Sequence, residues 1–559
     1  MTVDAMQDAT THRAKAFAIP RIDAKLWPLA GIVLVLVAQF SMIFTRAINW
    51  DEYSYWREVA YFADGRLDRP LQTFHVRLFE PLAGIFSTST DHIVAARLAM
   101  FGFELVTLWL LYTIARRFTE SANALFVPLA YVSAGYVLQH GFSFRIDPIA
   151  TAGLLAALYF LMRRPLEGKS IAGFAICAAF AAMITIKVIL YLPIFASAAA
   201  WQMMEANNRQ QTLARLTLCV VAAIAAFALF FWLHAAGMTA QQPAIERSGD
   251  QFDSSAGWIF FVGIPPYLPM MLKSFVLAPV LTMMIAITPV LLRRREIALP
   301  AKAFFVGAWM PLLTLLFYKN TAAYFYVFLF APLALACIPA IEAARTRYGT
   351  QFLALAFTLV ALGVFAMEDR TTIDRQRQIE VNVHEIFGEP VTYFDQNFML
   401  GDWPKANKFM TSWIMHRYHD AGRATYRAAM MERPIPLLLG NSESLRDLME
   451  GRNDHYLLPA DSAAVRNNYI PFSWPIWIAG KSFPATTTNN AEEFLVPGVY
   501  TVRGGPVLIN AERYGENDLV TIERGEHRIY AEGDTVLVWG ERLKVPVNPL
   551  EPGPINVDF

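Results

Sequence analysis

The chain has 559 residues, of which 55% are hydrophobic, 13% aromatic and only 17% charged, and its 47 basic residues balance its 47 acidic residues. This composition excludes an ordinary soluble globular protein, and the absence of a basic tract excludes nucleic-acid binding through charge. A membrane helix needs about 20 apolar residues. Eleven apolar segments are therefore predicted to cross a membrane: Leu26–Thr45, Ile93–Ala115, Ala122–Leu138, Ile149–Met162, Ile171–Thr185, Val188–Met203, Leu213–Leu233, Tyr267–Leu292, Lys302–Tyr318, Ala322–Ile341 and Phe352–Met367.

The first apolar segment follows a short polar tail, residues 1–25. It is too long for the core of a signal peptide, and no small-residue cleavage site follows it. We therefore expect it to be retained as the first membrane helix, with the tail in the cytoplasm.

The region from Ser170 to Met204 has two possible interpretations. As one helix it would span about 52 Å, far more than the roughly 30 Å hydrocarbon core. As two short helices, broken near Lys187 and Pro193, it places every basic loop cluster on the cytoplasmic side, as the positive-inside rule requires. The sequence favours two helices. The outer face then receives loop 46–91, residues 139–148, Lys187, the loop at 241–257, residues 319–320 and everything from residue 368 onward.

Residues 368–559 are predicted to form a second, extracytoplasmic domain. Helical stretches (Lys405–His419 and Ser442–Glu450) and the apolar run Ile435–Leu439 indicate an α/β portion. Short runs separated by turn residues predict a small antiparallel sheet after Pro497; they are Val499–Val502, Val507–Asn510, Leu519–Ile522, His527–Ala531 and Thr535–Trp539. This domain could bind glycan or peptide, but a lid or structural cap is the favoured interpretation. All three cysteines lie in predicted membrane helices, so neither a disulfide nor a cysteine metal site is expected in it.

Two adjacent carboxylates, Asp51 and Glu52, follow directly on the first apolar segment. A charge within the hydrocarbon costs on the order of 2.5–3.5 kcal/mol, so such groups usually face a cavity in which they function. The alternative is an interfacial cap in which Trp50, Tyr53 and Trp56 form an aromatic belt.

Several cations share the outer face with these carboxylates. Loop 46–91 is amphipathic, which suits helices lying on the membrane surface. The polar residues of this face include Arg57, His75, Arg77, Arg145, Asp147, Lys187 and Lys319. Cations beside a few carboxylates suit a substrate with an anionic head and an apolar tail, because cations neutralise the head and a carboxylate can act as a base. Snorkelling to the membrane surface is the alternative for Lys187.

Short motifs on this face occur in a defined order. Asp51-Glu52 is followed by Tyr55, the segment Phe74–Leu82 ends the first loop, and Arg145-Ile146-Asp147-Pro148 opens the fourth helix. Phe317–Asn320 and Tyr324–Tyr326 come late, before the C-terminal domain. Together these motifs resemble the GT-C glycosyltransferases, polytopic enzymes that use polyprenyl-phosphate sugars, and are closest to the aminoarabinose- and galacturonosyl-transferase-like branch. The chain departs from that branch where Arg77–Pro81 replaces a Lys-Pro-Pro run.

The resemblance implies a polytopic α-helical membrane protein of GT-C type with about 11 transmembrane helices. Residues 26–367 would form the catalytic domain, with juxtamembrane helices in loop 46–91, and residues 368–559 a periplasmic α/β plus β domain. The implied activity is inverting transfer of a sugar from a polyprenyl-phosphate donor to a glycolipid or glycan acceptor on the periplasmic face of a bacterial inner membrane. The implied roles are catalysis by Asp51, Glu52 and Asp147, binding of the donor phosphate by Arg57, Arg77, Lys187, Lys319 and Tyr324, and substrate binding by Tyr55, His75 and Arg145.

Cofactors and partners follow from the same scheme. No metal is required, because Arg and Lys can balance the phosphate, but Mg²⁺ or Mn²⁺ held by Asp51, Glu52, Asp147 and a histidine is the alternative. The expected partners are the donor, the acceptor and membrane lipids, with no nucleic acid, and the chain is expected to be a monomer. A lipid-linked glycan transporter and a glycan polymerase or ligase remain alternative functions. A helix cap remains the alternative for Asp147.

Overall fold

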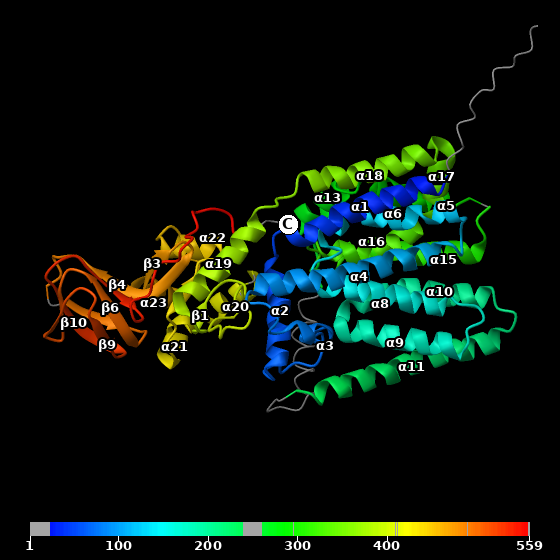
Figure 1. Cartoon of the computed structure of the whole chain (residues 1–559). Helices are drawn as coiled ribbons and strands as arrows, with labels where there is room; N and C mark the ends of the chain where they lie inside the picture. Colours follow the sequence, from blue (N-terminus) through cyan, green and yellow to red (C-terminus); the bar gives the residue numbers. More distant parts are fainter. Residues whose placement is uncertain are drawn as a thin grey trace, which may run out of the picture.

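The computed structural model describes residues 23–238, 260–294, 296–408, 410, 412–488 and 490–556. A bundle of apolar helices (the helix bundle, residues 26–366) and a mixed helix and sheet region (the C-terminal part, from residue 368) lie end to end (Figure 1). The predicted tail up to residue 22 and the predicted outer loop at 241–257 lie outside the described residues.

The helix bundle is typical of a multi-pass membrane protein. Within the described residues, five helical spans are long and apolar enough to cross a membrane: α1 (Leu26–Thr45), α4 (Ser89–Ala115), η3 with α10 (Ile186–Met204), α11 (Arg209–Ala235) and α15 with η4 (Leu299–Leu316). Two bent pairs raise this number to up to seven: α13 (Leu268–Val276) with α14 (Pro279–Leu291), bent by 96°, and α16 (Phe325–Ala336) with α17 (Ile338–Tyr348), bent by 65°. Four shorter apolar helices are α5 with α6 (Ser121–Val132), α8 (Ile146–Leu161), α9 (Gly168–Ile184) and α18 (Thr350–Ala366). Each predicted segment overlaps one of these helices or helix pairs, and the number that cross a membrane stays a prediction.

The predicted break near Lys187 is present. Helix α9 ends at Thr185, whose extended backbone (φ −159°, ψ 143°) stops the helix. The Thr185 hydroxyl accepts the backbone N–H of Lys187 at 3.3 Å and so starts the next helix, η3 (Ile186–Tyr191). The region predicted as either one oversized helix or two short ones therefore contains two.

The predicted single helix Ala122–Leu138 was wrong, because it is interrupted before Gly135. Helix α6 (Phe126–Val132) ends before it, and α7 (Gly135–His140) is a separate helix. The Gly135 N–H bonds to the carbonyl oxygen of Leu277 at 3.0 Å instead of to its own helix. A Cβ at Gly135 would lie 2.6 Å from that of Leu277, so only glycine permits this close approach.

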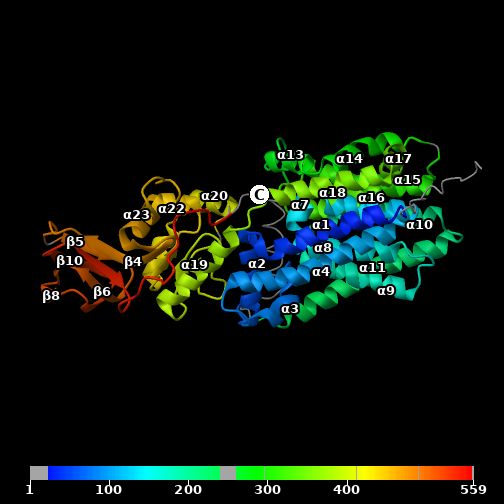
Figure 2. The same cartoon turned by 45° about the horizontal axis from the view of Figure 1, so that its top comes forward.

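Loop one forms α2 (Trp50–Ala63), α3 (Val76–Phe79) and η2 (Glu80–Leu82). Helix α2 starts at Asn49, whose side-chain oxygen accepts the Asp51 N–H at 3.0 Å, and its acidic first turn suits the positive end of the helix dipole. The helix lies between the bundle and the C-terminal part (Figures 1 and 2). It buries Tyr53, Trp56 and Val59 in a hydrophobic core that both regions share.

The C-terminal part contains two sheets. The larger has the order β1-β2-β4-β11-β6-β9, with β3 paired to β4, and the smaller has the order β5-β10-β7-β8. The strands are β1 (Tyr393–Phe394), β2 (Leu437–Leu439), β3 (Tyr469–Ser473), β4 (Ile476–Phe483), β5 (Asn490–Phe494), β6 (Gly498–Gly504), β7 (Val507–Ile509), β8 (Glu512–Tyr514), β9 (Leu519–Ile522), β10 (Gly525–Ala531) and β11 (Thr535–Trp539). The helices are α19 (Thr372–Phe387), α20 (Ser412–Ala421), α21 (Thr425–Glu432), α22 (Glu443–Met449) and α23 (Pro459–Asn468). Strands β1 and β2 are parallel, and the other pairs are antiparallel.

The five predicted strands are present, and a small antiparallel sheet exists, but it contains only two of them, β7 and β10. Strands β6, β9 and β11 join the α/β portion through β4, which is buried at most positions and therefore lacks the alternation that marks a half-exposed strand. The predicted helix Lys405–His419 begins only at Ser412. Before this helix, Lys405 and Tyr393 form an isolated parallel β-bridge. The backbone N–H of Tyr393 donates to the Pro404 carbonyl oxygen, and the Tyr393 carbonyl oxygen accepts the Ala406 N–H.

Helix α19 fastens the C-terminal part to the bundle. The buried Glu380 carboxylate accepts the backbone N–H groups of Ser89 and Thr90, at 2.5 and 3.0 Å, and so caps the N-terminus of α4. Arg377 pairs with Asp91 of the same first turn at 2.8 Å. These contacts hold the end of the bundle beside α2 in a fixed relation to the C-terminal part.

Candidate active site

Four separate elements bring polar side chains together at one end of the bundle. Asp51 comes from the first turn of α2, and Asp147 from the first turn of α8 after Arg145, which is the N-cap residue of that helix. Lys187 lies in η3, after the break that ends α9, and Tyr324 precedes α16. We call these five residues the ion-pair cluster.

Arg145 is the centre of the ion-pair cluster. Its guanidinium donates to the Asp51 carboxylate, and its Nε lies 3.6 Å from Asp147 Oδ2. The guanidinium also lies over the ring of Tyr324, 3.3 Å from the centroid, and 5.5 Å from that of Tyr55. A cation over an aromatic face is attracted by the ring, most strongly where water is excluded. Arg145 is therefore held in one orientation.

Lys187 and Asp147 form a second pair inside the cluster. Lys187 Nζ lies 2.6 Å from Asp147 Oδ1, and both side chains are buried, with 8% and 1% of their surfaces exposed. The other carboxylate oxygen of Asp147 has no hydrogen-bond partner among the described residues. The carboxylate thus points to Lys187 and not to the free N–H groups of its helix, which argues against the helix-cap interpretation.

Asp51 differs from the rest of the cluster in its access to solvent. Its side chain is 20% exposed, whereas that of Arg145 is 3% exposed. Beside it, burial raises the pKa of Tyr55 well above its usual value, so this hydroxyl stays protonated and can donate a hydrogen bond. The cluster therefore offers one accessible carboxylate backed by two buried cations.

Glu52, the neighbour of Asp51, lies apart from the cluster. Its fully buried carboxylate pairs with Arg97 of α4, with N–O distances of 2.8 and 3.0 Å. Arg97 also donates to the carbonyl oxygens of Arg46 and Ala47, at 2.8 and 3.0 Å, where α1 ends. The bidentate ion pair joins α4 to α2, and the bonds to the two carbonyl oxygens join α4 to the end of α1.

Arg57 and Arg77 also lie apart from the cluster. The Arg57 guanidinium covers the ring of Phe398 in the C-terminal part, 3.8 Å from the centroid. Arg77 donates from Nε to His234 Nδ1 at 2.9 Å and from a terminal nitrogen to the carbonyl oxygen of Leu233 at 3.2 Å. Both cations fasten loop one to neighbouring elements.

Lys319 and His75 lie closer to the cluster. Lys319 is half-buried in the segment before Tyr324, whose hydroxyl donates to Asn320 at 2.8 Å. His75 is buried, with its ring edge-to-face against Tyr55 and its Nε2 3.6 Å from Glu58. The predicted substrate-binding residues Tyr55, His75 and Arg145 thus occupy one neighbourhood.

Two residues of this region were missed by the sequence-based prediction. Arg97 holds Glu52, and a cation inside the predicted helix Ile93–Ala115 was a visible signal, because such charges are rare without a partner. Asn320 binds the Tyr324 hydroxyl, and although it ends the motif Phe317–Asn320 it was given no role. The described residues contain no group of three or more His, Cys, Asp or Glu side chains placed to hold a metal ion.

His75 should make the protein sensitive to acid. Burial lowers its pKa below the ordinary 6.5, although Glu58 opposes the shift. The unfolded chain therefore binds a proton at this ring more readily than the folded protein does. The free energy of unfolding is unaffected by this proton above about pH 6.5 and declines as the pH falls below that value. The unfolding temperature of the wild type, measured from pH 7.5 to pH 5, should fall more steeply than that of His75→Asn. Equal slopes would contradict this prediction.

The comparisons with known proteins bear on the fold. No family model and no curated protein sequence matches the chain. Among solved structures, ArnT from Cupriavidus metallidurans in the apo state matches with 13% identity and a TM-score of 0.54, over 76% of this chain and 95% of ArnT. ArnT bound to undecaprenyl phosphate matches with 15% identity and a TM-score of 0.43, over 64% of this chain and 73% of that one. The oligosaccharyltransferase of Archaeoglobus fulgidus in the apo form matches with 9% identity and a TM-score of 0.49, over 90% and 76%.

The match to apo ArnT extends over nearly all of that protein and includes most of the present chain. The similarity confirms the fold that the order of the sequence motifs predicted. The chain therefore shares the fold of ArnT.

Proposed function

We propose that this protein is a GT-C glycosyltransferase that moves a sugar from a polyprenyl-phosphate donor to a glycolipid or glycan acceptor. The observation that carries this proposal is the accessible Asp51 carboxylate backed by buried Arg145 and Lys187. ArnT, which shares the fold, has been solved with undecaprenyl phosphate bound, and this supports a polyprenyl phosphate as the lipid carrier. The distribution of basic loops supports a site on the periplasmic face of a bacterial inner membrane.

The ion-pair cluster supplies both groups that the transfer needs. Asp51 takes the proton of the acceptor hydroxyl as its oxygen attacks the anomeric carbon, and the bond from that carbon to the donor phosphate oxygen breaks. Protonation of Asp51 leaves Arg145 without its main partner, so this cation can stabilise the departing phosphate. Lys187, Lys319 and the Tyr324 hydroxyl complete the proposed phosphate site. A single displacement inverts the anomeric carbon.

The other predicted residues receive supporting roles in this proposal. Glu52 positions Asp51 by fixing the first turn of α2 through Arg97. Arg57 and Arg77 hold loop one in place. Arg145 and Lys187 already neutralise the two carboxylates of the cluster, so we propose that transfer requires no divalent metal.

A direct assay tests the proposal. Purified protein is incubated with a radiolabelled polyprenyl-phosphate sugar and a glycolipid acceptor, with and without EDTA. We expect labelled acceptor and free polyprenyl phosphate in equal amounts, at the same rate in both conditions. Movement of the intact donor lipid across vesicles without cleavage would contradict the proposal and indicate a transporter. Loss of activity in EDTA, restored by Mg²⁺ or Mn²⁺, would contradict the metal-free scheme.

Variants of the Asp147–Lys187 pair should change the unfolding temperature and the turnover differently. Asp147→Asn leaves a buried ammonium without its carboxylate, so we expect a lower unfolding temperature and at least a tenfold loss of turnover. The double variant Asp147→Asn/Lys187→Met removes both charges and should recover most of the unfolding temperature, yet stay inactive and bind donor more weakly. Thermal unfolding, donor binding and turnover are measured on the same preparations. A double variant with wild-type donor affinity would show that Lys187 serves only to neutralise Asp147.

A further inference from the structure

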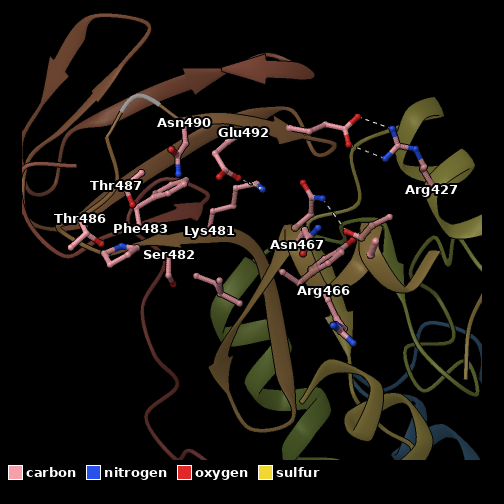
Figure 3. Close-up of a pocket in the computed structure, with 18 residues that line it drawn as sticks. Arg427, Arg466, Asn467, Lys481, Ser482, Phe483, Thr486, Thr487, Asn490 and Glu492 are labelled. Carbon is pink, nitrogen blue, oxygen red and sulfur yellow. Dashed lines mark hydrogen bonds and ion pairs between the residues drawn. The ribbon is translucent and has the colours of Figure 1, made fainter. Parts of the chain in front are cut away.

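A pocket of about 750 Å³ lies in the C-terminal part, between helices α21 and α23 and strands β4 and β5. It shares no residue with the ion-pair cluster. Its volume is within the range of about 300–1,000 Å³ that is common for small-ligand sites. Figure 3 shows that side chains from both the helices and the strands surround it.

Two ion pairs fix the walls of this pocket. Lys481 of β4 is buried, and its Nζ lies 3.1 Å from Oε2 of Glu492 on β5, whose side chain is 30% exposed. Arg427 of α21 binds Glu493 through two parallel contacts of 2.9 and 2.7 Å, which join the helices to the smaller sheet. The pocket is thus held open by contacts on its walls.

The lining is rich in groups that both donate and accept hydrogen bonds. Exposed amides and hydroxyls line it, from Asn467, Ser482, Thr486 and Asn490. The two large aromatic side chains of the lining, Tyr469 and Phe483, are buried. A ligand for this pocket must therefore be polar and must offer many hydroxyl-like groups.

We propose that this pocket binds a saccharide. Two neighbouring hydroxyls of a sugar ring match the Lys481–Glu492 pair, because one can accept from the ammonium while the other donates to the carboxylate. The amides of Asn467 and Asn490 then bind further hydroxyls on opposite sides. The use of this site to hold the glycan of an acceptor rests on the proposed transferase function, whereas saccharide binding itself does not.

A peptide is the competing ligand, because β5 is an edge strand of the smaller sheet and edge strands can pair with an added strand. Such binding needs pockets for alternate side chains of the peptide. Strand β5 contributes the polar residues Asn490, Glu492 and Glu493 to the pocket, and the aromatic rings of the lining are buried. The lining therefore has no apolar subpocket for a peptide side chain. The lining favours a saccharide.

Binding is tested on the full-length protein in detergent, by saturation-transfer NMR and titration. The probes are maltotriose, chitotriose and the core oligosaccharide of a bacterial lipopolysaccharide. We expect at least one probe to bind, and the double variant Asn467→Ala/Asn490→Ala to bind it about thirtyfold more weakly, since two lost hydrogen bonds of about 1 kcal/mol each correspond to that factor. Both asparagines are exposed, so this variant should fold normally. Lys481→Met should weaken binding further.

Two controls make the outcome specific. Arg513→Ala removes an exposed ion pair with Glu532 in the same sheet, outside the pocket, and should bind as the wild type does. Asp51→Asn should also bind the saccharide normally, because it lies outside the pocket. Wild-type protein that binds saccharide but fails the transferase assay would overturn the proposed function alone. No binding of any probe, equal binding by the pocket variants, or pocket-dependent binding of a random hexapeptide library in place of the sugars would overturn the saccharide site.

Discussion

Asp51→Asn should lower turnover by about 10²-fold or more while donor affinity stays near that of the wild type. The substitution keeps the shape and the contact with Arg145 but removes the basic oxygen that takes the acceptor proton. The Asp51 side chain is partly exposed, and Arg145 retains a second carboxylate partner in Asp147, 3.6 Å away. The unfolding temperature should therefore change little. Single-turnover transfer from a labelled polyprenyl-phosphate sugar measures the effect.

A conservative variant adds an independent measurement. Asp51→Glu, which keeps the basic group on a longer side chain, should retain part of the turnover. Substantial activity of Asp51→Asn would instead assign the base to Asp147, the other carboxylate that faces Arg145.

Glu52→Gln should destabilise the protein strongly, although Glu52 adjoins Asp51 in the chain. Its carboxylate and the Arg97 guanidinium are fully buried, and removal of one member of such a pair leaves an uncompensated charge. The expected loss in free energy of unfolding is about 3–5 kcal/mol. Thermal unfolding in detergent and elution from size-exclusion chromatography measure it.

The double variant Glu52→Gln/Arg97→Met provides the control for this pair. It removes both charges and should unfold at a higher temperature than either single variant, because neither charge is left buried alone. Asp51→Asn is the matched control for a neighbouring acidic residue. A Glu52→Gln protein that is stable but inactive, beside an active Asp51→Asn protein, would reverse the two roles.

The sequence predicted the helix bundle well because apolar length is a local property. The predicted segment Leu26–Thr45 matches α1, and each of the other ten overlaps an apolar helix or a helix pair, with Ala122–Leu138 interrupted before Gly135. The break near Lys187 was also predictable, because the length limit of a membrane helix and the charges of the loops both favour two short helices over one long helix. The interruption before Gly135 was not, because its cause is a hydrogen bond to Leu277, about 140 residues away in the chain.

The residue types of the candidate site could be predicted, but their pairing could not. Asp51, Arg145, Asp147, Lys187 and Tyr324 were all identified from residue type and predicted topology. Adjacent residues of a helix point in different directions, so Asp51 and Glu52 reach different partners, and sequence spacing alone gives no reason to prefer one. The larger sheet was likewise hidden, because β4 is buried on both faces and lacks a periodic pattern.

The sequence by itself thus determined the class of the protein, the order of its apolar helices and the residue types at their ends, since these depend on composition and on contacts between near neighbours. The tertiary structure decided which carboxylate meets which cation, which of two adjacent acids stays accessible, and how the strands of the C-terminal part join. These features depend on contacts between segments far apart in the chain, as between Arg145 of α8 and Asp51 of α2, or Lys187 of η3 and Asp147 of α8. The order of residues in the chain does not specify such contacts, because they form only when the helices pack against one another.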